Sequence, residues 1–142
     1  MNGQVSVHRS LCLLATILLS GCTEKPAWEV THPATGLLTF RGKPVADADI
    51  VLFPQDPAWP GTVRPRARTK ADGTFAVWTW EPGDGAPAGT YKATLIHNEI
   101  GESKGAVVAK PNDLPPKYER PDSSDLQITI VTGENQIPPI AL

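Results

Sequence analysis

Cysteine and histidine are scarce in this sequence, and their scarcity excludes several kinds of site. The 142 residues include two cysteines, Cys12 and Cys22, and three histidines. A disulfide framework needs paired thiols within the folded part of the chain, and a structural zinc site needs about four thiolate or imidazole ligands. Neither set is present after residue 22, so stability must come from a packed core, and we expect neither a metal nor another cofactor.

The sequence also lacks an apolar run long enough to cross a membrane. The longest, residues 11–19, has nine residues, whereas a transmembrane helix needs about 20. A polar stretch with Arg9 and no acidic residue precedes this run, and Leu19-Ser20-Gly21-Cys22 closes it. This order is typical of a lipoprotein signal peptide, because small residues admit the chain to a peptidase and the Cys22 thiol then receives lipid.

We therefore predict a signal peptide over residues 1–21 and a lipid anchor on Cys22, at the extracytoplasmic face of a membrane in the cell envelope. Several acyl chains, each contributing about 0.8 kcal/mol per buried methylene, make such attachment effectively permanent. An ordinary signal peptide that ends near a cysteine is the alternative. Residues 22–33 are mostly polar and are interpreted as a tether, which leaves residues 34–142 for one domain.

Charge of one sign is not concentrated anywhere along the chain. The predicted leader holds one of the 13 basic residues and none of the 15 acidic ones, so the mature chain carries 12 against 15 and a net charge of −3. A nucleic-acid surface needs clustered basic side chains. We therefore expect no nucleic-acid partner.

Helical periodicity is absent as well, while 15 prolines and 12 glycines separate short apolar runs. The strongest turn signal is Ala71-Asp72-Gly73 between two β-rich runs. Seven strands are predicted at residues 36–40, 50–53, 66–70, 74–80, 90–97, 125–131 and 136–142. Short strands at this spacing indicate an all-β fold, a seven-stranded antiparallel β-sandwich. Alternation predicts an inward set of Leu38, Ile50, Leu52, Phe75, Val77, Tyr91, Ala93, Leu95, Leu126, Ile128 and Ile130.

Several strings in this order are similar to a known family. Arg41-Gly42-Lys43-Pro44-Val45 followed by residues 48–54 resembles the opening of carboxypeptidase-regulatory-like, or transthyretin-like, domains. Residues 69–75 resemble their strand-turn-strand signature, although Lys70 stands where an acid is usual. The strings at residues 83–91, 116–118 and 124–142 resemble short planctomycete-type lipoproteins of this superfamily. The resemblance implies a prealbumin-like (Ig-like) sandwich without a catalytic residue.

Catalysis finds little support in the residues themselves. Two histidines, His32 and His97, remain after the predicted leader, and no Gly-x-Ser-x-Gly motif is present. Ser103, Ser123 and Ser124 fall in loops, whereas a nucleophile–base pair is best held on rigid strands. We predict that the chain is not an enzyme.

The loop aspartates raise the question of a calcium site. They are Asp47, Asp49, Asp72, Asp84, Asp122 and Asp125. No stretch has the spacing of an EF-hand loop, and an aspartate before glycine is explained as a turn former. We predict no metal ligand, with a cluster at one end of the sandwich as the alternative.

Trp78 and Trp80 are two residues apart on one predicted strand and share a face opposite Phe75. They either lie under one of the long connections, residues 55–65 or 98–120, or form an exposed binding face. Exposed indoles stack on sugars or hold a protein strand.

The combined prediction is a membrane-anchored lipoprotein with a non-catalytic binding or scaffold domain, whose partner is an envelope protein or polysaccharide. The alternative is a calcium- or glycan-binding accessory module beside a separate enzyme.

Overall fold

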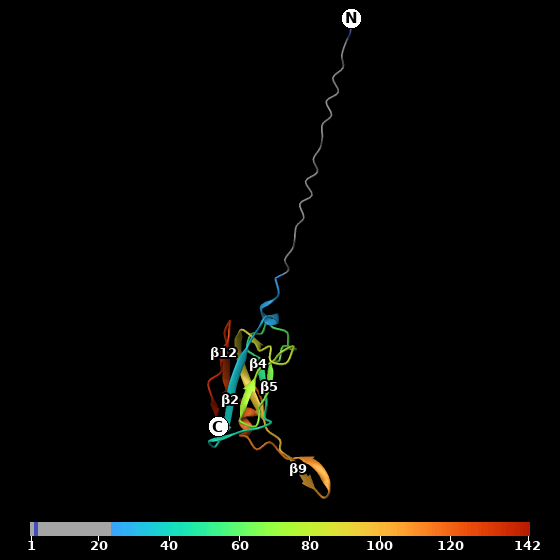
Figure 1. The fold of residues 1–142 in the computed structure, drawn as a ribbon, viewed down its shortest axis with the longest axis vertical. Coiled ribbons are helices and arrows are strands. Elements are labelled where there is room, and N and C mark those ends of the chain that lie inside the picture. The colour runs from blue at the N-terminus through green and yellow to red at the C-terminus, as the bar shows by residue number, and fades with distance from the viewer. Residues whose placement is uncertain (1, 3–23) are drawn as a thin grey trace.

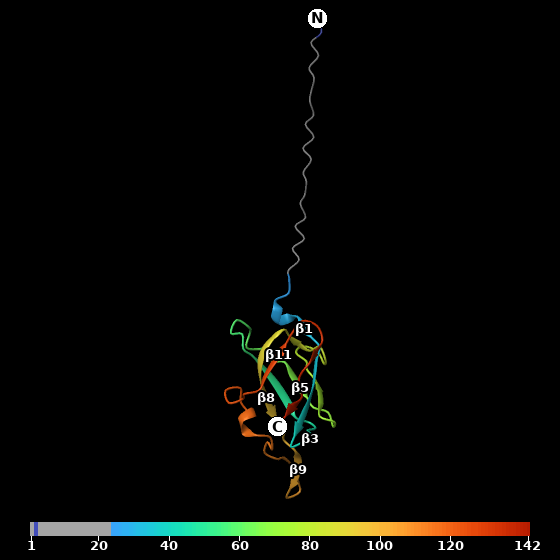
Figure 2. The ribbon, with the colours of Figure 1, turned by 90° about the vertical axis from the view of Figure 1, so that its left-hand side faces the viewer.

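The computed structural model describes residue 2 and residues 24–142. The latter fold into two larger packed β-sheets and two small two-stranded sheets (Figures 1 and 2). The first sheet is wholly antiparallel and has the strand order β11-β8-β4-β5. Its strands are β4 (Asp49–Pro54), β5 (Arg66–Arg68), β8 (Gly89–Ile96) and β11 (Gln127–Ile130). The longest ladder joins β4 to β8, and it aligns Ile50 with Leu95 and Leu52 with Ala93. Because side chains alternate along a strand, this register places all four on one face.

The second sheet is built around β2 (Ala34–Phe40), which every other strand of that sheet pairs with. Its partners are β3 (Lys43–Pro44), β6 (Thr74–Ala76), β12 (Asn135–Gln136) and β13 (Ile140–Ala141). The first two pair with β2 antiparallel, but β12 and β13 run parallel to it. The all-β sandwich is therefore confirmed, while the prediction of purely antiparallel pairing is wrong at the C-terminal segment.

The C-terminal segment differs from the single strand predicted over residues 136–142 because of its prolines. Pro138 and Pro139 separate β12 from β13. Proline has no N–H to donate, so the ladder is interrupted there. The chain nevertheless returns to β2, where Leu142 donates from its N–H to the carbonyl of Thr39.

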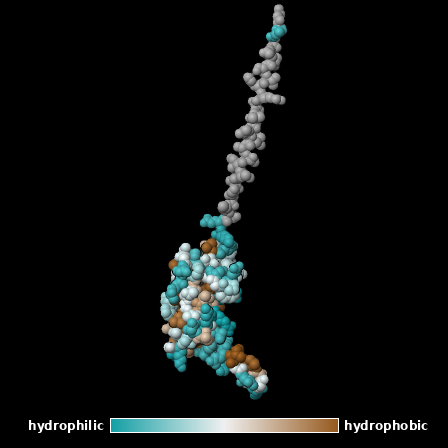
Figure 3. Space-filling model, viewed as in Figure 1, coloured by the Kyte–Doolittle hydropathy of each residue, from teal (hydrophilic) through white to brown (hydrophobic). Residues whose placement is uncertain are grey.

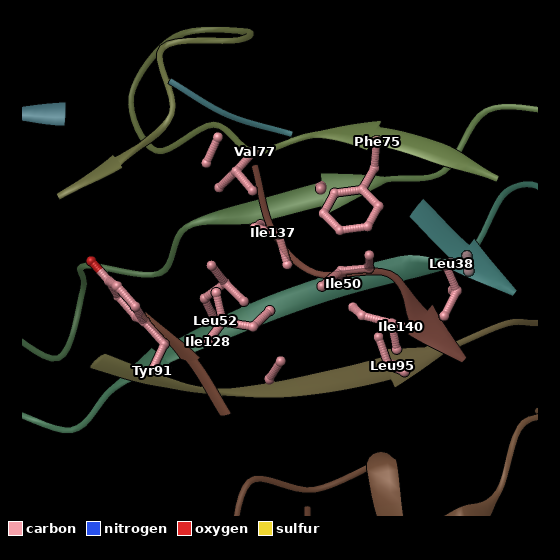
Figure 4. Close-up of a cluster of buried hydrophobic side chains, with 14 of the residues drawn as sticks. Leu38, Ile50, Leu52, Phe75, Val77, Tyr91, Leu95, Ile128, Ile137 and Ile140 are labelled. Atoms are coloured by element: carbon pink, nitrogen blue, oxygen red, sulfur yellow. The ribbon is translucent and has the colours of Figure 1, made fainter. Parts of the chain in front are cut away.

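The core between the sheets contains most of the predicted inward set (Figure 4). Ten of the eleven residues are buried, and several of them are fully inaccessible. Leu126 is the exception, because it precedes the first ladder residue of edge strand β11 and is only partly buried. Burying one Leu, Ile or Phe side chain stabilises the fold by about 1.5–3 kcal/mol. The core also includes Val63, Leu114, Ile137 and Ile140, which lie outside the predicted inward set.

The strand predicted over residues 74–80 passes from one sheet to the other. Residues 74–76 pair with β2, whereas Trp78 forms an isolated bridge with Arg66 of the first sheet. Alternation continues through the crossing, since Phe75, Val77 and Thr79 are buried. The prediction of one continuous strand was wrong because hydrophobic alternation does not specify which sheet supplies the partner.

The connection over residues 98–120 contains more order than the sequence suggested. It holds the hairpin of β9 (Ile100–Ser103) and β10 (Ala106–Ala109), followed by the 3-10 turn η2 (Pro116–Tyr118). Lys104 and Gly105 have φ values of 52° and 78°, as a two-residue type I′ turn requires. At the base, the Lys110 ammonium donates to the Glu99 carboxylate over 2.7 Å.

Tyr91 provides a test of the core. Its hydroxyl donates to the carbonyl of Pro87 over 2.6 Å, and burial raises the pKa of its phenol above the ordinary value. Replacing Tyr91 by phenylalanine leaves that carbonyl without its partner, so we expect the free energy of unfolding to fall by about 1–3 kcal/mol at neutral pH. Urea unfolding measures this loss, and Tyr118→Phe, at a half-buried ring, is the control.

The same phenol predicts a pH dependence above about pH 10. There the unfolded chain releases the Tyr91 proton while the folded chain retains it, so stability falls as pH rises. The loss from this group is up to about 1.4 kcal/mol per pH unit. Tyr91→Phe should show a flatter alkaline profile than the unsubstituted chain, and parallel profiles would contradict the assignment.

Candidate functional site

The two predicted binding-face tryptophans have different surroundings. Trp78 is half-buried, and the Arg66 guanidinium lies over its ring at 4.1 Å from the centroid. Trp80 is 48% exposed and packs edge-on against Trp28, with 6.5 Å between ring centroids. Neither of these two contacts comes from residues 55–65 or 98–120, and Trp80 is exposed. The two indoles line separate hollows and do not form one stacking platform.

Residues 27–32, expected to belong to a free tether, are part of the folded domain. Residues Ala27–Glu29 form the 3-10 turn η1, and β1 (Thr31–His32) pairs antiparallel with β7 (Ala86–Pro87). The tether prediction is therefore wrong for this part of 22–33. The mainly polar composition of this segment gave no sign of the backbone pairing, which does not depend on an apolar run.

Asp84 organises the loop that carries Trp80. Its carboxylate accepts hydrogen bonds from the backbone N–H groups of Thr79, Trp80 and Glu81, at 2.7–3.2 Å. Thr79 in turn donates from its hydroxyl to the carbonyl of Gly85. Charge-assisted bonds of this kind are shorter and stronger than neutral ones, so they hold the loop in one conformation.

The remaining loop aspartates are also engaged by the protein. Asp47 and Asp49 face Arg68, and Asp125 accepts from Lys117 over 2.8 Å. Asp72 accepts from the N–H and hydroxyl of Thr74, which lowers the pKa of its carboxyl, and Asp122 lies 3.4 Å from Arg120. Within residues 24–142, no three His, Cys, Asp or Glu side chains come together as metal ligands. The aspartates are therefore explained as turn formers and ion-pair partners.

A hollow of about 490 Å³ lies where the turn after β2 meets the base of the β9–β10 hairpin. Its lining combines apolar and charged side chains: Phe40, Arg41, Lys43, Pro44, Val45, Ala46, His97, Glu99, Asp113 and Leu114. His97 and Asp113 lie within hydrogen-bond reach, with 2.7 Å between Nδ1 and Oδ1. Sequence reasoning did not anticipate this pair, because Asp113 is 16 residues away in a segment without clear periodicity.

A histidine–carboxylate pair acts as a catalytic base only beside a nucleophile or a polarised substrate. None of the residues that line this hollow carries a hydroxyl or thiol. Two of the serines considered as nucleophiles bond to the backbone instead. The Ser124 hydroxyl donates to the carbonyl of Ala93, and the Ser123 hydroxyl donates to the carbonyl of Lys117. Ser103 ends β9 in the hairpin. The structure therefore joins His97 to an aspartate but not to a serine.

The hairpin beside this hollow is the most exposed apolar element of the described chain. Ile100 is 72% and Val107 78% exposed, and β10 is exposed along its whole length. Figure 1 shows the hairpin projecting from the end opposite to η1, and Figure 3 shows hydrophobic side chains on it. Exposed apolar side chains gathered on one projection are typical of a contact surface.

The predicted lipidation residue and its predicted cleavage motif precede the main part of the chain that the structure describes, residues 24–142. Cys22, Leu19, Ser20 and Gly21 lie outside the described residues. Among the residues that are described, none forms a helix long and apolar enough to cross a membrane.

Comparison with known proteins gives distant structural similarities. No family model and no curated protein matches the chain. A 9R-lipoxygenase from Cyanothece is similar over 83% of this chain and 17% of its own, with 18% identity and a TM-score of 0.44. A proposed carbohydrate-binding protein from Pseudomonas aeruginosa is similar over 79% and 87%, with 15% identity and a TM-score of 0.36. This chain thus spans a small part of the lipoxygenase, and neither likeness bears on its function.

Proposed function

We propose that this chain is an envelope lipoprotein of transthyretin-like type, lipid-anchored at Cys22, with a non-catalytic sandwich that binds or organises an envelope partner. The observation that carries the proposal is the sequence Leu19-Ser20-Gly21-Cys22 after a nine-residue apolar run. Lipid on that cysteine would fix the chain at the extracytoplasmic face of a membrane.

The arrangement of the domain supports a binding or scaffold role. The chain enters the sandwich at one end, whereas the apolar hairpin projects from the other (Figure 1). The hollow lined by His97 lies beside the base of this hairpin, because Glu99 also lines it. An anchor at Cys22 would therefore leave the hairpin free to meet a partner. The exposed aliphatic side chains of Ile100 and Val107 favour a protein partner over a polysaccharide, because sugars are bound mainly by aromatic faces and polar groups.

The anchor is tested by replacing each cysteine separately. Cys22→Ala is expected to move the protein from the membrane fraction to the soluble extracytoplasmic fraction, because the thiol at the predicted cleavage site, which would receive the lipid, is removed. Cys12→Ala lies within the predicted leader and should leave fractionation unchanged. The measurement is fractionation of cells combined with incorporation of labelled palmitate.

Two results would contradict the proposal. One is retention of Cys22→Ala in the membrane fraction with unchanged label, and the other is loss of label in Cys12→Ala but not in Cys22→Ala.

A further inference from the structure

The end of the sandwich where the chain enters carries an aromatic cluster, which we call the indole pair: Trp28 of η1 and Trp80 of the Asp84 loop. Their rings meet edge-on with centroids 6.5 Å apart. Trp80 keeps 48% of its surface exposed despite this contact, and neighbouring Val30 keeps 42%. A hollow of about 330 Å³ opens between the two rings, Lys25 and Glu29. The pair is therefore packed together but uncovered on its outer side.

The indole pair is held rigidly relative to the sandwich. The pairing of Thr31 with Pro87 and of His32 with Ala86 fixes the chain immediately after η1. On the other side, Asp84 fixes the backbone of Trp80 through three N–H groups. The backbone on both sides of the indole pair is therefore held in place relative to the β-sheets.

The length of chain before the pair limits what can cover it. Trp28 stands six positions after Cys22, and a fully extended chain spans at most about 3.5 Å per residue. The α-carbon of Trp28 can therefore lie no more than roughly 21 Å from the α-carbon of Cys22, and the Trp80 ring lies beside the Trp28 ring. A lipid-modified Cys22 places the bilayer surface within that distance.

We propose that the indole pair inserts into the headgroup–acyl boundary of the bilayer that holds the anchor, so that the sandwich stands on the membrane with a fixed orientation. The inference rests on the proposed lipid anchor at Cys22. Indole suits this boundary because its ring is apolar while its N–H can bond to water or to a headgroup. The occupant of this surface is then lipid.

The charges nearby indicate that the contact is apolar rather than electrostatic. Glu24, Lys25 and Glu29 give residues 24–29 a net charge of −1. Such a segment is not attracted to anionic lipid, which recruits clustered Lys and Arg. The contact should therefore be as strong on phosphatidylcholine as on vesicles that contain phosphatidylglycerol, and it should not weaken with salt.

The test uses the full-length lipidated protein in phosphatidylcholine vesicles, with and without bromine near the top of the acyl chains. Bromine quenches indole fluorescence only at short range, so two of the four tryptophans should be quenched. In Trp28→Phe/Trp80→Phe this quenching should be lost. In the matched variant Trp59→Phe/Trp78→Phe, which alters indoles packed against Tyr91 and Arg66, it should remain.

The anchor and the indole contact fail in different ways. Absence of the lipid mass on Cys22, or failure to sediment with vesicles, would overturn the anchor and the inference together. Full sedimentation with no quenching that depends on Trp28 and Trp80 would overturn the indole contact alone. Quenching suppressed by soluble oligosaccharide would also overturn it and would assign Trp80 to glycan instead.

Discussion

Replacing Gly85 by alanine is expected to release β1 from β7 and to lower the free energy of unfolding by about 2–4 kcal/mol. Gly85 has a φ of +89°, and a Cβ there would overlap the carbonyl of His32. The obstructing atoms belong to the backbone and cannot rotate away, so the His32–Ala86 pairing must break. Urea unfolding measures the loss, and near-ultraviolet circular dichroism of the indoles reports release of Trp28.

Gly83→Ala is the matched control for this substitution. Gly83 has a similar φ of +80°, but a Cβ there would meet open space. Gly83→Ala should therefore lower the free energy of unfolding only through backbone strain, by about 1–2 kcal/mol. It should leave the circular dichroism of the indoles unchanged. Equal losses in the two variants would show that β1 does not pack closely on Gly85.

The second large effect is expected at Phe75. Its ring should decide whether Gly36→Ala lowers or raises the free energy of unfolding. Gly36 pairs with Phe75 across β2 and β6, and the ring lies over the glycine. Phe75→Ala removes a buried ring and should cost about 3–5 kcal/mol. Gly36→Ala should cost about 1–3 kcal/mol in the unsubstituted chain, because its Cβ would overlap the ring.

In the Phe75→Ala background the ring is absent, so an alanine at position 36 should stabilise strand β2. Gly36→Ala should then be neutral or stabilising by about 0.5–1 kcal/mol, since glycine weakens a strand. A double-mutant cycle from urea unfolding gives the coupling between the two positions. Phe40→Ala, at a half-buried ring, is the control and should cost less than Phe75→Ala. If the losses in free energy of unfolding for Gly36→Ala and Phe75→Ala were additive, the contact between the Phe75 ring and Gly36 would be contradicted.

Alternation identified the core because it reports local geometry. Ile50, Leu52 and Leu95 could be assigned to the inner face from strand periodicity alone, and all three are buried. The pairing of strands depends on contacts across the whole chain, which periodicity does not contain. For that reason the parallel return of Ile140 to Leu38 and the crossing at Trp78 were not predictable.

The candidate site was less accessible to sequence reasoning than the core. Trp80 was identified from its spacing, but its partner Trp28 lies 52 residues earlier in a segment without secondary-structure signals. His97 and Asp113 meet because β9 and β10 fold back on themselves between them. The hairpin turn at Lys104-Gly105 was hard to predict from the sequence, since Asn-Gly and Asp-Gly are the usual type I′ pairs.

The central position of β2 has a consequence for export. This strand begins the sandwich, yet two of its partners, β12 and β13, come from the last residues of the chain. A chain that crosses a membrane N-terminus first cannot complete the second sheet until those residues have passed. Pairings of such long sequence separation form slowly. For a chain exported as proposed above, this topology would leave the second sheet incomplete until translocation ends.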